Sequence, residues 1–138
     1  MFKRPQWLHR IWPKQNNAAG PSRLRAENLT RHTILAEQLE VADHGANRRK
    51  GLLGRDHLPT GEGLWIKPCE AVHTFGMRFA IDLVYIDRRQ RVRKVRHRVP
   101  AWRISACFSA SSVLELPAGT AAATSTQRGD TLAITRAL

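Results

Sequence analysis

The chain has 138 residues, which fits one domain, and its 42% hydrophobic and 25% charged content is ordinary for a folded soluble protein. It contains no apolar run of about eighteen residues, which excludes a transmembrane segment. No apolar stretch of a secretory signal follows the basic amino terminus, and two cysteines, Cys69 and Cys107, make no disulfide framework. We therefore expect a cytoplasmic protein.

The net charge of +12 is concentrated in two parts of the chain. Residues 1–31 carry a balance of +6, and residues 88–103 carry +8 with eight Lys or Arg and no acid, which leaves −2 for the remainder. Localised basic charge binds nucleic acid, anionic surfaces or acidic proteins, and it also keeps a surface solvated. Both interpretations stay open.

Residues 1–31 are predicted to form a flexible basic tail, because prolines, glycines and scattered charges interrupt any hydrophobic period. Within this tail Trp7, Leu8, Ile11 and Trp12 fall on one helical face. That pattern is typical of a short helix on an anionic membrane or in a partner's groove. A loosely docked tail without a helix is the alternative.

The first predicted strand covers residues 32–43 and is followed by a short basic helix that ends at Gly54. Residues 59–63 then make a turn, and residues 64–66 a short strand.

Residues 81–87 form the most apolar run of the chain and predict an interior strand covered on both faces. Asp82 lies inside this run, and a buried carboxylate needs a partner, for which we expect Arg48 or Arg55. Residues 88–90 predict a hairpin turn, and residues 91–99 a returning strand, with basic residues typical of a sheet edge.

An irregular connection is expected to start at residues 100–103 and to run through residue 112. Residues 113–117 predict a strand with a second embedded carboxylate, Glu115, followed by a helical turn within residues 120–126 and a closing strand over 131–134.

Together these elements predict one mainly β (α+β) domain over residues 32–138. About six or seven short strands with one or two short helices favour a compact antiparallel-rich barrel or rolled sheet.

Four blocks of the chain, in this order, resemble the family catalogued as domain of unknown function 192. They are Arg48-x-x-Gly51-Leu52-Leu53-Gly54-Arg55, Val72-His73-Thr74-Phe75-Gly76-Met77-Arg78-Phe79-Ala80-Ile81-Asp82, Val113-Leu114-Glu115-Leu116-Pro117-Ala118-Gly119 and Gly129-Asp130. The resemblance implies a small, compact, mainly β domain found chiefly in prokaryotes, and it implies no settled activity.

The polar residues within these blocks are the candidate site. We expect them to line one groove, with Met77 on its wall, in an accessory protein that binds a small polar ligand or a protein partner. They are Arg48, Arg55, His73, Thr74, Asp82 and Glu115. Arginine–carboxylate pairs also hold geometry without any ligand, so a purely structural network is the alternative.

A hydrolase-like site is a second hypothesis. His73 would act as general acid or base and Asp82 would orient it, although no nucleophile stands out. Cys69 precedes His73 by four residues, but the paired short spacings of zinc sites are missing, so we predict no metal and no cofactor.

The third hypothesis is polyanion binding through the basic region, because arginine-rich strands near an aromatic such as Trp102 can follow a phosphate backbone. The residues concerned are Arg89, Arg91, Arg93, Lys94, Arg96 and Arg98. No known nucleic-acid motif accompanies them, and we expect a monomer or weak oligomer.

Overall fold

A computed structural model describes residues 23–136 and confirms the expected class, a mainly β rolled sheet with two short helices. Nine strands lie in this part of the chain: β1 (Leu24–Asn28), β2 (Thr33–Ala42), β3 (Glu62–Ile66), β4 (Ala71–His73), β5 (Ile81–Ile86), β6 (Val92–Val99), β7 (Ile104–Ala106), β8 (Ser112–Pro117) and β9 (Leu132–Arg136). The helices are α2 (Gly45–Lys50) and α3 (Thr120–Ala123). Neither helix of this described part is long and apolar enough to cross a membrane.

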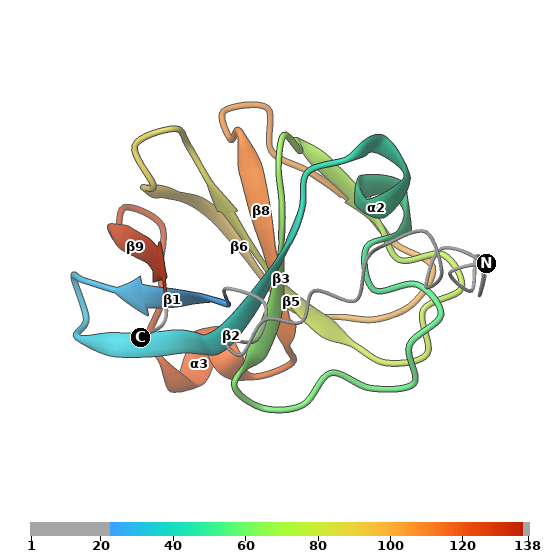
Figure 1. Ribbon diagram of the computed structural model, residues 1–138, viewed down its shortest axis with the longest axis horizontal. Coiled ribbons are helices and arrows are strands. Elements are labelled where there is room, and N and C mark those ends of the chain that lie inside the picture. Colours follow the sequence, from blue (N-terminus) through green and yellow to red (C-terminus); the bar gives the residue numbers. More distant parts are fainter. Residues whose placement is uncertain (1–22, 137–138) are drawn as a thin grey trace, which may run out of the picture.

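Seven strands form one curled sheet in the order β6-β5-β8-β3-β2-β1-β9. Neighbouring strands are antiparallel except β2 and β3, which run parallel. The two outermost strands meet at one corner, where the Val92 amide donates to the Asp130 carbonyl and the Gly129 amide to the Val92 carbonyl, both at 2.8 Å. The sheet is therefore a partly closed barrel, with β9, β1 and β2 on the left of Figure 1 and α2 on the right.

Strand β5 is buried on both faces, as its continuous apolar sequence predicts. Successive side chains of a strand point to opposite faces, and β5 divides accordingly between two cores. Val84 and Ile86 belong to an inner core inside the curl, with residues of β1, β2, β6, β8 and β9. Leu83 and Tyr85 belong to an outer core on the other face. The position of a residue along β5 thus decides which core it joins.

A second layer covers the outer core. It consists of the antiparallel pair β4–β7 and the segment that follows α2. Val72 and Ser105 face each other across this pair and are buried, whereas the neighbouring pair His73 and Ile104 is exposed. One face of the small sheet therefore packs on the barrel and the other meets solvent.

Three local expectations need correction. Leu24–Asn28 is a strand between β2 and β9, so the predicted tail through residue 31 is wrong for these residues. Residues 100–112 contain the short strand β7, which pairs with β4, and are not wholly irregular. Helix α2 ends at Gly51, three residues before the predicted exit at Gly54. Residues 1–22, with the helical face proposed for Trp7 to Trp12, lie outside the described residues.

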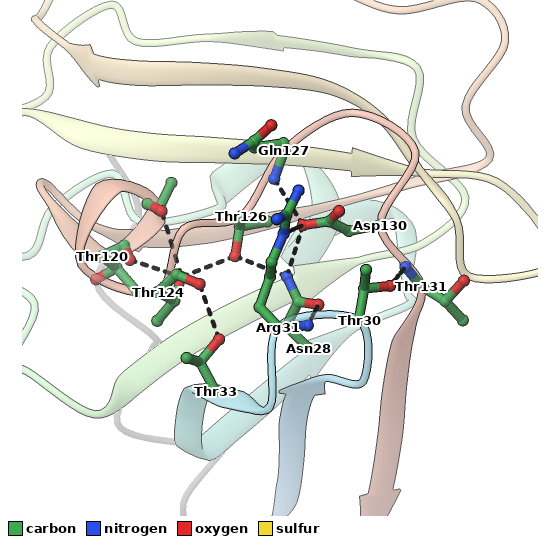
Figure 2. Close-up of polar contacts among 11 residues, drawn as sticks. Asn28, Thr30, Arg31, Thr33, Thr120, Thr124, Thr126, Gln127, Asp130 and Thr131 are labelled. Carbon is green, nitrogen blue, oxygen red and sulfur yellow. Dashed lines mark hydrogen bonds and ion pairs between the residues drawn. The ribbon is translucent and has the colours of Figure 1, made fainter.

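A buried polar cluster explains why the weakly apolar β1 joins the sheet. The Asp130 carboxylate accepts hydrogen bonds from Asn28 at 3.0 Å, from the Arg31 Nε at 3.2 Å and from the Gln127 amide at 2.9 Å. Thr126 also accepts from Asn28, at 3.2 Å. Figure 2 shows these contacts joining the β1–β2 turn to the segment between α3 and β9. The cluster is a structural tie between the two ends of the domain.

Candidate functional site

A cavity of about 380 Å³ lies between α2, β4 and β8. Its wall is formed by α2 with the turn after it, by the segment 68–73, and by Met77 and Glu115. Small-molecule sites usually enclose roughly 300–1,000 Å³, so this cavity suits a small ligand.

Glu115 is the buried acid of this cavity, with only 4% of its surface exposed. Burial raises its pKa to about 7, although the Leu52 amide and the charge of Arg55 act in the lowering direction. Its Oε2 atom has no hydrogen-bond partner among the described residues. The carboxylate lies against Gly51, where an added Cβ would come within 3.2 Å and 3.3 Å of its two oxygens. A glycine at this position leaves room for the carboxylate.

Arg48 brings the opposite charge from the last turn of α2. Its Nη1 donates to the Pro68 carbonyl at 3.3 Å, while its Nε is buried without a hydrogen-bond partner among residues 23–136. None of the ion pairs within those residues joins Arg48 to Glu115. The cavity wall therefore holds an unpaired donor and an unpaired acceptor, and each buried unpaired polar group costs about 1–3 kcal/mol.

Three further side chains on the cavity wall carry a ring or a sulfur atom. They are His73, Cys69 and Met77. The His73 ring is exposed and its centroid lies 5.0 Å from that of Phe75. Burial raises the pKa of the Cys69 thiol, whose Sγ contacts the Ala71 carbonyl oxygen at 3.2 Å. A thiol with a raised pKa is a poor nucleophile at neutral pH, which disfavours thiolate chemistry here.

Asp82 lies on the other face of the sheet from this cavity. Across β5 and β8, Leu83 is paired with Glu115 and Asp82 with Leu116, so the two carboxylates point to opposite faces. This geometry separates Asp82 from the cavity, and the expectation that it orients His73 is wrong.

The Asp82 carboxylate accepts its hydrogen bonds from backbone amides. The expected partners, Arg48 and Arg55, do not contact it. Its Oδ1 accepts from the Arg98 amide and its Oδ2 from the Ala121 amide, both at 2.8 Å. A register shift in the β5–β6 pairing leaves the first amide outside the regular ladder, and the second belongs to the first turn of α3, whose amides lack intrahelical partners. These two hydrogen bonds join Asp82 to the irregular part of β6 and to α3.

Two further predicted site residues also lie elsewhere. The buried Thr74 hydroxyl donates to the Pro100 carbonyl at 2.7 Å and accepts from the Arg103 amide at 2.9 Å, which ties two loops together. Arg55 donates to Glu40 at 2.8 Å and influences Glu115 only through its charge. Of the six predicted residues, the structure brings together Arg48, His73 and Glu115.

Among the described residues, no group of three or more His, Cys, Asp or Glu side chains is arranged to hold a metal ion.

The six basic residues predicted for polyanion binding separate into three places. Arg89, Arg91 and Arg93 line a surface groove. Lys94 and Arg96 lie opposite Tyr85 and Leu83 in the β5–β6 pairing, on the face that carries β7. Arg98 lies apart, with its guanidinium 3.1 Å from the position of a Cβ on Gly119, beside α3.

Comparison with known proteins identifies the family. The model of the family DUF192, described as Uncharacterized ACR, COG1430, matches residues 26–134. The chain belongs to this family. The resemblance drawn from the four sequence blocks is thereby confirmed, and the family description carries no activity.

Two solved structures are similar in fold to this chain. One is a protein of unknown function from Novosphingobium aromaticivorans DSM 12444, with a TM-score of 0.69, 19% identity, and coverage of 80% of this chain and 83% of that one. The other is a candidate transcription regulator from Sinorhizobium meliloti 1021, with a TM-score of 0.71, 22% identity, and coverage of 80% and 91%. At these identities the likeness concerns the fold alone. Among curated proteins, none matches the sequence.

Sequence reasoning missed a row of exposed rings beside the cavity. The centroids of Phe75 and Trp102 lie 5.8 Å apart with their planes at 25°, and the His73 ring, tilted by 31° from Phe75, extends the row. The signal in the sequence was weak. Large side chains recur at alternate positions in His73-x-Phe75 and Trp102-x-Ile104, but Phe75 lies in a turn and Trp102 in a bend, where strand alternation does not apply.

Proposed function

We propose that this DUF192 domain binds a small organic acid in the cavity between α2, β4 and β8. The observation that supports the proposal most directly is the pair of buried atoms, Arg48 Nε and Glu115 Oε2, without hydrogen-bond partners in the described chain. Buried polar groups are normally satisfied, so an unpaired donor and acceptor on one cavity wall favour a bound polar molecule.

The chemistry of the wall favours an anion. A ligand carboxylate accepts a charge-assisted hydrogen bond from Arg48, and Glu115, whose raised pKa keeps it partly protonated near neutrality, donates to the same ligand. Arg49 and Lys50 add positive charge at the rim. The remaining wall includes Leu53, Val72 and Met77, which suit an apolar body. A short-chain carboxylic acid combines these features.

Thermal unfolding with a panel of short-chain carboxylic acids and their matched primary amides tests this proposal. A true ligand at about 100 times its dissociation constant stabilises the folded state by about 2.7 kcal/mol, which raises the melting temperature by several degrees. The acids are expected to raise it and the uncharged amides are not.

Two variants give the experiment its specificity. Arg48→Lys keeps the charge and removes the Nε donor, so the stabilisation by carboxylates is expected to fall at least tenfold in apparent affinity. Arg128→Gln removes one charge from an exposed position outside the cavity and is expected to leave the affinity unchanged. If no acid stabilises the protein, or if both variants behave like the natural chain, the proposal is wrong.

The two groups also predict how binding depends on pH. A bound carboxylate beside Glu115 favours the protonated form of that residue, so binding takes up a proton once the free protein has lost it. The affinity is therefore expected to fall as the pH rises above about 7, and Glu115→Gln is expected to remove this decline.

A further inference from the structure

A row of exposed apolar side chains runs over the outer face of the β4–β7 pair, away from the barrel. The rings of His73, Phe75 and Trp102 follow one another at centroid separations of 5.0 Å and 5.8 Å, and we call these three the aromatic row. Trp102 is 68% exposed, and Ile104 beside it on β7 is exposed as well. Trp102 and Ile104 bury little apolar area in the domain itself, so this part of the row marks an interaction surface.

A second exposed ring follows β7 in the sequence. It belongs to Phe108, which is 82% exposed. The next residue, Ser109, accepts a hydrogen bond from Arg93 Nε at 3.3 Å. Phe108 follows Trp102 by six positions, so the Cα atoms of these two residues lie at most about 22 Å apart.

Beyond Phe108 lies a groove of about 520 Å³ at the β5–β6 turn, which we call the arginine groove. Its arginines are Arg88, Arg89, Arg91 and Arg93. Two acids, Glu70 and Asp87, also line it. The Asp87 carboxylate is already occupied, because its Oδ1 accepts from the Arg89 and Arg91 amides at 2.8 Å and 3.1 Å.

Two further basic side chains lie on the face of β6 that carries β7. Lys94 Nζ donates to the Ala106 carbonyl of β7 at 2.8 Å, and Arg96 lies on the same face of β6 two residues further on. We call the surface from the arginine groove along β7 to Trp102 the strip. It carries Lys94 and Arg96 beside β7 and has an exposed ring near each end, Phe108 and Trp102. Residues 88–103, which supply most of it, contain no acid.

We propose that this strip binds single-stranded nucleic acid, with bases stacked on the aromatic row and on Phe108 and with phosphates in the arginine groove. Base faces are open only in single strands, and stacking on aromatic side chains tolerates any sequence. The basic flank supplies the phosphate contacts that give such binding its affinity. An anionic membrane or an acidic peptide would use the charge, but neither requires exposed ring faces such as that of Trp102. The proposal uses other basic residues than the carboxylic-acid cavity, and His73 and Glu70 border both places.

Fluorescence anisotropy with a labelled oligothymidylate and oligouridylate of about ten nucleotides tests the proposal, since single-strand sites cover roughly 4–16 nucleotides. Trp102→Ala is expected to weaken binding about 5- to 150-fold, which corresponds to one stacked base, and Trp102→Phe to restore most of it. Ile34→Ala, at another exposed apolar position, on β2, is the matched control and should bind like the natural chain.

The salt dependence separates phosphate binding from general charge. Arg89→Gln together with Arg91→Gln is expected to reduce the slope of log affinity against log salt by about 1.4, or about 0.7 for each phosphate that the variant no longer neutralises. Arg23→Gln with Arg136→Gln removes the same charge from the β1–β9 side of the sheet and should leave the slope unchanged.

Several results would overturn the proposal. They are the absence of binding at low salt, equal affinity for duplex DNA, equal effects of the strip and control variants, or displacement of the oligonucleotide by anionic vesicles or an acidic peptide at lower concentration. The cavity hypothesis stands or falls separately, because the strip variants leave Arg48 and Glu115 in place.

Discussion

Glu115 gives the sharpest test of the electrostatics inferred for this domain. Burial raises its pKa from 4.5 to about 7. Between these two values the unfolded chain has released a proton that the folded chain retains, so the folded state loses stability as the pH rises. The displacement corresponds to about 3 kcal/mol, which is lost progressively between pH about 4.5 and about 7 and is constant above that range.

Glu115→Gln mimics the protonated carboxyl group and cannot ionise. We compare the free energy of unfolding of the variant with that of the natural chain. The difference, variant minus natural chain, is expected to be about 3 kcal/mol larger at pH 8 than at pH 4. The Leu52 amide keeps an acceptor in the variant, because the glutamine carbonyl replaces the carboxylate oxygen. The predicted quantity is a difference between two proteins, so titration of the histidines they share cancels.

Urea unfolding of both proteins at several pH values measures this difference, provided that the slopes of the unfolding transitions agree. Glu70→Gln is the matched control, since it makes the same side-chain change at an exposed position on the same cavity wall. Only a pH dependence that exceeds the one measured for this control is assigned to Glu115. A pH-independent difference for Glu115→Gln, within about 0.5 kcal/mol, would refute a buried carboxyl group with a raised pKa. It would also remove the support that Glu115 gives to the carboxylic-acid proposal.

Two further predictions concern the structural acids. Asp82→Ala leaves two backbone amides without their acceptor, so it is expected to lower the free energy of unfolding, measured in urea, by about 3 kcal/mol. The control Asp43→Ala, at an exposed position, is expected to change it by less than about 0.5 kcal/mol. Burial acts to raise the pKa of Asp130, but its hydrogen bonds outweigh burial and hold the pKa below 3.8. The stability that Asp130 contributes is present above that value and lost as the pH falls through the folded pKa, so Asp130→Asn is expected to flatten the acid limb of a melting-temperature profile.

Local patterns in the sequence were sufficient for the class of fold and for most strands. The apolar run over residues 81–87 predicted an interior strand because only a strand covered on both faces needs apolar residues at every position, and β5 has this burial. The strand containing Glu115 and the hairpin after β5 were found for similar reasons. The β1 strand was missed, because its five residues lack a clear period and it is held by pairing and by the buried Asp130 cluster.

The sequence blocks also identified the family, and they supplied Arg48, His73 and Glu115 as candidate residues. Only the tertiary structure decided which candidates meet. A strand sends alternate residues to opposite faces, so the register of β5 on β8 separates Asp82 from Glu115 although both are buried acids on neighbouring strands. The stretch from Cys69 to Asp87 therefore contributes to two separate parts of the structure. Its first residues line the cavity, and Asp82 near its end accepts hydrogen bonds from backbone amides on the other face of the sheet, because neighbouring residues of a strand point to opposite faces.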